Sequence, residues 1–119
     1  MSADIVHTRG TTFEDQVAVR VLGIVLDRMF PGTTIERVLD DEGRILWSLA
    51  EPTGYLNFLI VQQEDEWATE NFGSYPIPVI TKHTVSGLAH ALTDCLEKRW
   101  QETWNVLLQT QSQLKALAA

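Results

Sequence analysis

The sequence is poor in cysteine and in basic side chains, and it contains no long apolar run. Cys95 is the only cysteine among 119 residues, which excludes an internal disulfide and a cage of thiolates around a metal ion. Lysine and arginine number 9 against 16 acidic residues, so the net charge is -7. Because binding to nucleic acid phosphates depends on clustered cations, this balance argues against a direct nucleic acid partner and favours a basic protein partner.

No apolar run approaches the roughly 18 residues that a membrane-spanning helix needs. The first ten residues, MSADIVHTRG, also lack the basic and apolar regions of an export signal, so we expect a cytoplasmic protein without a membrane partner. An apolar content of 45% over this length predicts one globular domain, residues 1–119, of which residues 1–11 are expected to be flexible.

Capping and turn residues divide the chain into helices and strands. Thr12 and Asp15 form a capping-box pattern before an apolar helix over about 13–30, which Pro31 and Gly32 end. Strand patterns follow at 33–40, 44–50 and 55–62, and their short connections predict an antiparallel meander. The segment 76–81 is expected to be a short edge strand, and a long helix is expected over about 84–117. The fold class is therefore α+β, in the order α-β-β-β-(β)-α, with a sheet of three or four strands.

The final helix carries more apolar surface than one sheet can cover. It would be about 50 Å long, whereas a seven-residue strand spans about 23 Å. Three arrangements remain open: the helix bends near Arg99 and folds back on the first helix, its end frays, or its tail docks on another chain, most simply a second copy. The face expected to mediate such docking comprises Trp100, Trp104 and Leu108.

Acidic residues from separate parts of the chain are predicted to gather at one end of the sheet. In a meander, the first hairpin turn and the end of the third strand lie at the same edge, and the first helix begins there with Glu14 and Asp15. We call this expected surface the acidic pole, with Trp67 and Tyr75 at its rim. Its predicted partner-binding residues are Asp40, Asp41, Glu42, Glu64, Asp65, Glu66, Trp67, Glu70 and Tyr75. Crowding of like charges should raise the carboxylate pKa values there. The alternative is a solvated loop over 62–76 whose aromatic residues pin it to the sheet.

No pattern of residues indicates catalysis, a cofactor or a metal ion. His83 and His90 lack the spacing of a zinc motif, and Ser48 and Ser86 lack the context of a nucleophile. In outline, the order of elements is similar to class I secretion chaperones, toxin immunity proteins and small phage proteins that block host defence. The leading hypothesis is a non-enzymatic protein-binding domain that presents the acidic pole to a basic protein, as an inhibitor, immunity or phage anti-defence protein would. The alternatives are a homodimeric chaperone or adaptor that uses the final helix, and a small enzyme with an unrecognised pocket.

Overall fold

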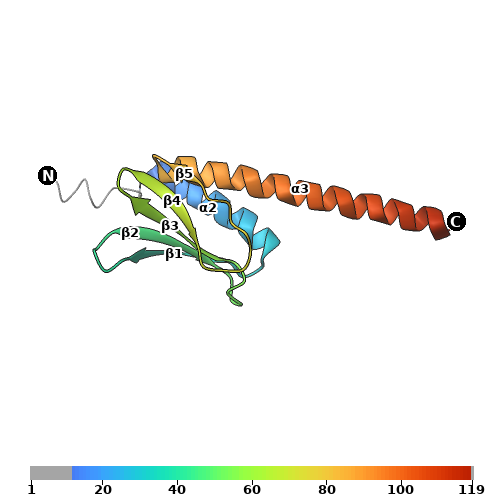
Figure 1. Cartoon of the computed structure of the whole chain (residues 1–119), viewed down its shortest axis with the longest axis horizontal. Coiled ribbons are helices and arrows are strands. Elements are labelled where there is room, and N and C mark those ends of the chain that lie inside the picture. Colours follow the sequence, from blue (N-terminus) through green and yellow to red (C-terminus); the bar gives the residue numbers. More distant parts are fainter. Residues whose placement is uncertain (1–11, 119) are drawn as a thin grey trace.

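The computed structural model describes residues 12–118, so the expectation about residues 1–11 lies outside the described range. Two helices pack on one face of a single antiparallel sheet (Figure 1), which confirms the predicted α+β class. The sheet has five strands rather than three or four, in the order β1-β2-β3-β4-β5. The elements are α2 (Phe13–Met29), β1 (Thr34–Leu39), β2 (Ile45–Ala50), β3 (Asn57–Gln63), β4 (Glu66–Asn71), β5 (Thr81–Lys82) and α3 (Val85–Ala118).

The predicted capping residue begins helix α2. Thr12 Oγ1 accepts a hydrogen bond from the Asp15 amide at 3.2 Å, and the helix ends at Met29, two residues before Pro31. Gly32 then turns the chain with a φ of 91°, which is accessible to glycine at little cost. The face of α2 opposite the core stays exposed, including Phe13 and Ile24. The helix therefore has cover on one side only.

The segment predicted as a loop over 62–76 contains strand β4. Gln63 pairs with Glu66, so Glu64 and Asp65 form a two-residue turn, in which Glu64 has a φ of 56°. This geometry is typical of tight hairpins between antiparallel strands. The edge strand predicted over 76–81 is shorter than expected and begins further along the chain, since β5 spans only Thr81–Lys82. The loop alternative for this stretch is therefore wrong over its first half.

One apolar core fills the space between the sheet and the two helices. Its largest fully buried side chains come from α2, β2, β3 and α3, together with the residue just before β3, and include Leu22, Leu26, Leu49, Leu56, Phe58, Leu88 and Leu92. A smaller apolar cluster of Leu46, Val61 and Ala68 lies on the other face of the sheet, which neither α2 nor α3 covers. The packing thus forms two layers.

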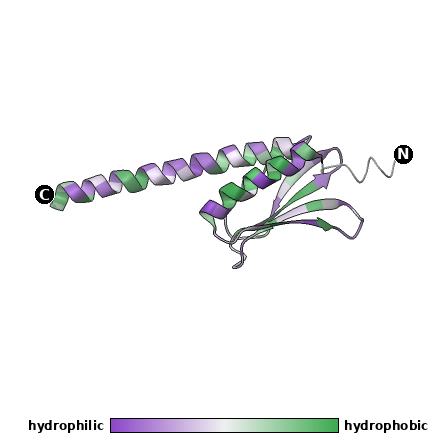
Figure 2. Ribbon diagram, turned by 180° about the vertical axis from the view of Figure 1, so that it is seen from behind, coloured by the Kyte–Doolittle hydropathy of each residue, from purple (hydrophilic) through white to green (hydrophobic). Residues whose placement is uncertain are grey.

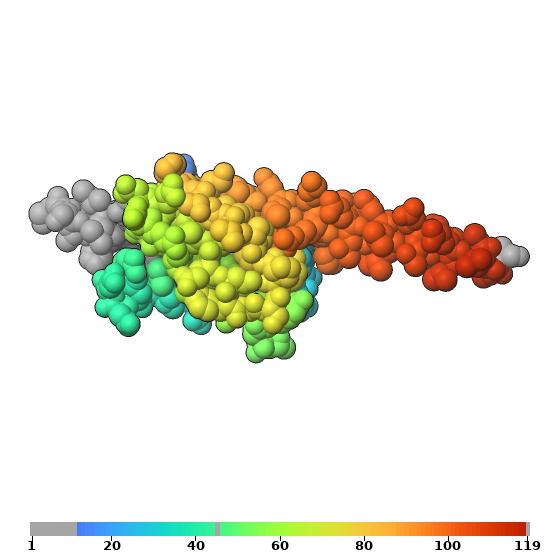
Figure 3. All heavy atoms as spheres, viewed as in Figure 1, coloured from blue at the N-terminus to red at the C-terminus, as the bar shows by residue number. Residues whose placement is uncertain are grey.

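Helix α3 is continuous from Val85 to Ala118 and extends far past the sheet (Figure 1). Its buried residues end at Leu96, and residues 100–118 are all exposed. A fold-back near Arg99 is therefore not observed. In the view of Figure 3, the projecting end of α3 has no other described segment packed against it. Within residues 12–118, no helix combines the length and apolar content required to cross a membrane.

Candidate functional site

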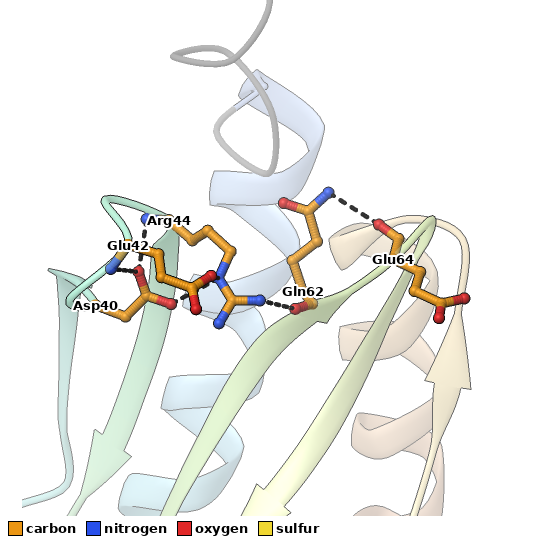
Figure 4. A network of polar contacts seen from close by, with 5 residues as sticks. All are labelled: Asp40, Glu42, Arg44, Gln62 and Glu64. Carbon is orange, nitrogen blue, oxygen red and sulfur yellow. Dashed lines mark hydrogen bonds and ion pairs between the residues drawn. The ribbon is translucent and has the colours of Figure 1, made fainter.

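At the acidic pole, one arginine organises the carboxylates (Figure 4). Arg44 Nε lies 2.7 Å from Asp40 Oδ2 and 3.4 Å from Glu42 Oε2. The same side chain donates from Nη1 to the carbonyl oxygen of Gln62 at 3.4 Å, which joins the β1–β2 hairpin to strand β3. Two of the predicted partner-binding carboxylates are therefore already paired within the protein.

The predicted rise in carboxylate pKa does not occur at Asp40. Desolvation pushes the pKa of Asp40 upward, but hydrogen bonds from the Arg44 amide and guanidinium, with further attraction from that cation, lower it by more. The Asp40 Oδ1 atom accepts from the amides of Glu42 and Arg44 at 3.0 Å and 2.7 Å. Asp40 therefore shapes the turn, and its pKa lies below the ordinary value.

The lowered pKa of Asp40 predicts a loss of stability in acid. A group whose pKa is lower in the folded state stabilises that state above its unfolded pKa of about 3.9, and this contribution disappears as the pH falls through the folded pKa. We expect the urea midpoint to fall more steeply below about pH 4 in the native chain than in Asp40→Asn. The control is Asp41→Asn, whose side chain makes none of these hydrogen bonds. Equal slopes for the native chain and Asp40→Asn would contradict the assignment.

Some acidic residues do meet at this end, whereas others serve different roles. The turns that hold Asp41 and Glu64 come together, and the Glu64 carboxylate points away from Arg44. Within residues 12–118, Asp41, Glu64 and Glu66 form no ion pair. Asp15 does not contribute to this surface, because it is buried and its Oδ1 accepts the Ser86 amide at 2.9 Å. It caps the first turn of α3, together with Thr84 Oγ1, which accepts from the Gly87 amide.

Three other predicted pole residues lie elsewhere. Trp67 is only 4% exposed and packs in the main core, so it does not line the rim. Tyr75 lies near the opposite end of the sheet, where its ring packs on Phe30 with centroids 4.7 Å apart and Arg99 lies 5.7 Å from its centre. Glu70 is exposed but four residues further along β4 than Glu66, a separation of about 13 Å. The pole is therefore smaller than predicted and has no exposed aromatic anchor among these residues.

The projecting half of α3 carries two exposed tryptophans. Trp100 and Trp104 are 46% and 49% exposed, and the apolar side chains that follow them are exposed to a similar degree. Figure 2 shows apolar segments recurring along this part of the helix. The exposed apolar residues from position 100 onward are Trp100, Trp104, Val106, Leu107, Leu108, Leu114 and Leu117.

Most of these residues lie on one face, which we call the α3 stripe. Residues at steps of four and then three stay on one side of a helix that turns about 100° per residue. This alternating spacing gives the a and d positions of a coiled coil, and it continues beyond the point where burial against the domain ends. The α3 stripe comprises Trp100, Trp104, Leu107, Gln111, Leu114 and Ala118. The predicted face contained only Trp100, Trp104 and Leu108, because steps of four alone lead off this stripe; Leu108 lies at its margin.

A small pocket marks the point where the α3 stripe leaves the domain. It has a volume of about 50 Å³ and lies between the end of α2 and α3. Its lining comprises Val25, Arg28, Met29, Glu97 and Trp100. The stripe is therefore continuous with a hollow that has apolar walls and is bordered by one cation, Arg28, and one carboxylate, Glu97.

Comparisons with known proteins found no protein family, no characterised protein and no solved structure that matches this chain. Among residues 12–118, no group of three or more histidine, cysteine or acidic side chains is arranged to hold a metal ion.

Proposed function

We propose that this protein is a non-enzymatic adaptor that forms a homodimer through the α3 stripe. The observation that carries the proposal is that the apolar spacing of α3 continues after burial against the domain has ended. The buried residues Val85, Ala89, Leu92 and Leu96 follow steps of four and three, and steps of four and three recur along the exposed segment from Trp100 to Leu114. Within about one turn, the apolar face of α3 thus changes from buried against the domain to exposed.

The projecting segment has the properties of a helix that is stabilised by a partner. Isolated helices of fewer than about 12–15 residues are marginal in water, and slightly longer ones gain little from propensity alone. Residues 100–118 include three threonine or asparagine residues, Thr103, Asn105 and Thr110, which are weak helix formers. Packing of Trp100 and Trp104 against another helix would offset this weakness and remove them from water.

A second copy in antiparallel orientation fits the α3 stripe best. In the antiparallel register that aligns the two stripes, Trp104 lies against Leu114 of the other copy, and Leu107 lies against Gln111 of the other copy. Trp100 then lies against Ala118. Each tryptophan therefore packs against a smaller side chain. In a parallel pair, Trp100 would face Trp100 of the other copy, and Trp104 would face Trp104 of the other copy. Alternation of large and small side chains packs a helical interface better than matched large ones.

The part of α3 next to the domain, beside Trp100, is complementary to the C-terminal end of α3 in a second copy. In the antiparallel pair, the C-terminal end of one α3 reaches the pocket beside Trp100 of the other copy. Helix C-termini carry a partial negative charge, and near this pocket the two cations Arg28 and Lys98 outnumber the carboxylate Glu97. The pairing would be about 27 Å long and would cover on the order of 500 Å² of apolar side chain on each copy. With flanking atoms, this approaches the roughly 800 Å² per partner of a standard interface.

Sedimentation equilibrium of the intact chain tests the proposal. We expect the mass of a dimer at micromolar concentrations and a shift toward the monomer on dilution. A monomer across the whole range would overturn it.

A second candidate function is the predicted recognition of a basic protein surface by the acidic pole. The hydrogen bond from Arg44 to the Gln62 carbonyl favours it, because this contact holds the two turns together and leaves Glu64 directed outward. In the proposed antiparallel dimer, the two poles would lie at opposite ends, so that one assembly could bind two targets.

The test of the acidic pole is to neutralise its second turn. We expect Glu64→Gln, Asp65→Asn and Glu66→Gln together to slow association with a basic partner by about tenfold at low salt, and less at high salt. The matched control is Glu36→Gln, Glu70→Gln and Asp94→Asn, which removes three exposed charges from other places. An equal association rate for the native chain and the pole variant would exclude the hypothesis.

A further inference from the structure

Two neighbouring hollows lie between α2 and β1 on the helix-covered face. β1 is an edge strand, because among the described residues it pairs only with β2. A cleft of about 340 Å³ lies between it and α2, lined by Gln16, Val19, Arg20, Ile35, Arg37 and Trp47. A second hollow, of about 520 Å³, adjoins it and shares Arg20 and Ile35. The two form one groove along β1, which we call the α2–β1 seam.

The α2–β1 seam is basic in a chain that is acidic overall. Three of the 9 lysine and arginine residues line it, namely Arg20, Arg28 and Arg37. Within residues 12–118, no carboxylate forms an ion pair with any of them. The acidic side chain that lines the seam, Asp27, accepts the Gly32 amide at 2.9 Å and so stabilises the end of α2. The local charge is therefore positive.

The floor of the α2–β1 seam holds the cations in place. The guanidinium of Arg37 lies 5.7 Å from the centre of the Trp47 ring, which favours a position over the aromatic face. Gly23 allows close packing of α2 on β1, because a Cβ atom there would lie 2.2 Å from Ile35 Cδ1. The result is an apolar floor of Ile35 and Trp47 with arginines above it.

We propose that the α2–β1 seam binds an extended acidic segment of a partner protein. The free edge of β1 offers backbone groups that an added strand can pair with, in the manner of β-strand addition. Side chains alternate between the two faces of a strand, so acidic residues at every second position would face Arg20 and Arg37. The residues between them would face away from the helices. Recognition thus combines main-chain pairing with charge.

Other occupants fit the α2–β1 seam less well. The β1 strand of a second copy would bring Arg37 of both copies toward the same groove, where like charges repel. A small anion would be held by the arginines but would leave the free edge of β1 unpaired. The open groove extends from Trp47 past Ile35 to Thr33, which suits a chain better than a compact ligand.

The experiment uses a fluorescent peptide that alternates glutamate and valine over eight residues, titrated with the intact protein and followed by fluorescence anisotropy. We expect Arg20→Gln and Arg37→Gln each to weaken binding by about tenfold, the size expected for a lost hydrogen bond to a charged group. A control with equal charge loss is Lys115→Gln on α3, which should bind the peptide like the native chain.

Two further peptides separate charge from strand pairing. Replacing every glutamate by glutamine should abolish binding, and N-methylation of alternate backbone amides should weaken it strongly, because pairing with β1 is then blocked. The proposal is overturned if the glutamate peptide does not bind, if the glutamine peptide binds equally well, or if the arginine variants match the lysine control. Unchanged binding of the N-methylated peptide would overturn the strand-addition mode.

Discussion

Trp104→Glu is expected to convert the proposed dimer to a monomer at micromolar concentrations. In the proposed antiparallel pairing, Trp104 would lie against Leu114 of the other copy, and two-fold symmetry would introduce two buried charges for one substitution. An aromatic residue at the centre of an interface contributes on the order of 2 kcal/mol, so both sites together should cost about 4 kcal/mol. The dissociation constant should then rise about a thousandfold. Sedimentation equilibrium over a wide concentration range measures this change directly.

The chain offers a matched control for this substitution. Gln109→Glu adds the same charge one turn further along α3, on the side opposite the α3 stripe, and should leave the dimer intact. Since Trp104 is 49% exposed and lies beyond the domain, neither change should unfold the rest of the chain. Circular dichroism should nevertheless show less helix in Trp104→Glu, because the projecting segment loses its partner. An equal loss of dimer in both variants would point to charge in general rather than to the stripe.

The sequence predicts the order of the elements well because their ends carry strong local signals. Thr12 caps α2 as expected, and Gly43 takes the positive φ of 78° that the first hairpin turn requires. Strand β4 is hard to predict because its single large apolar residue, Trp67, stands next to Glu66 and near Glu70, and its outer neighbour β5 is very short. The available signal was the alternation of Trp67 and Thr69 with Glu66, Ala68 and Glu70.

The candidate surfaces were harder to predict, because they depend on how the layers pack. Charge counts cannot show that Arg44 pairs with Asp40 while Arg20 and Arg37 pair with no described carboxylate. Nor can they show that Asp15 turns inward to cap α3, since that contact joins residues 71 positions apart. The α3 stripe could be predicted from the sequence, because apolar residues at steps of four and three indicate one helix face without knowledge of the fold.

Trp67→Ala provides the sharpest test of the correction at the acidic pole. A partner-binding residue at a rim could be removed with little effect on folding, whereas the structure places Trp67 in the main core at 4% exposure. Truncation of a buried tryptophan leaves a cavity and costs about 3–5 kcal/mol. Since domains of this kind are stable by only about 5–15 kcal/mol, the loss is a large share of the total. We expect the thermal midpoint to fall by about 10–20 °C.

The measurement is best made with Trp104→Glu present in every sample, so that dissociation of the dimer does not contribute to the unfolding curve. Urea unfolding then compares this parent with versions that carry Trp67→Ala or Trp67→Phe. The phenylalanine variant should lose less stability, because part of the ring volume remains. Trp100→Ala, at 46% exposure, is the control for loss of a tryptophan outside the core and should cost about 1 kcal/mol or less. If Trp67→Ala unfolds at the same urea concentration as the parent, Trp67 does not pack in the core, and its role at the pole would return.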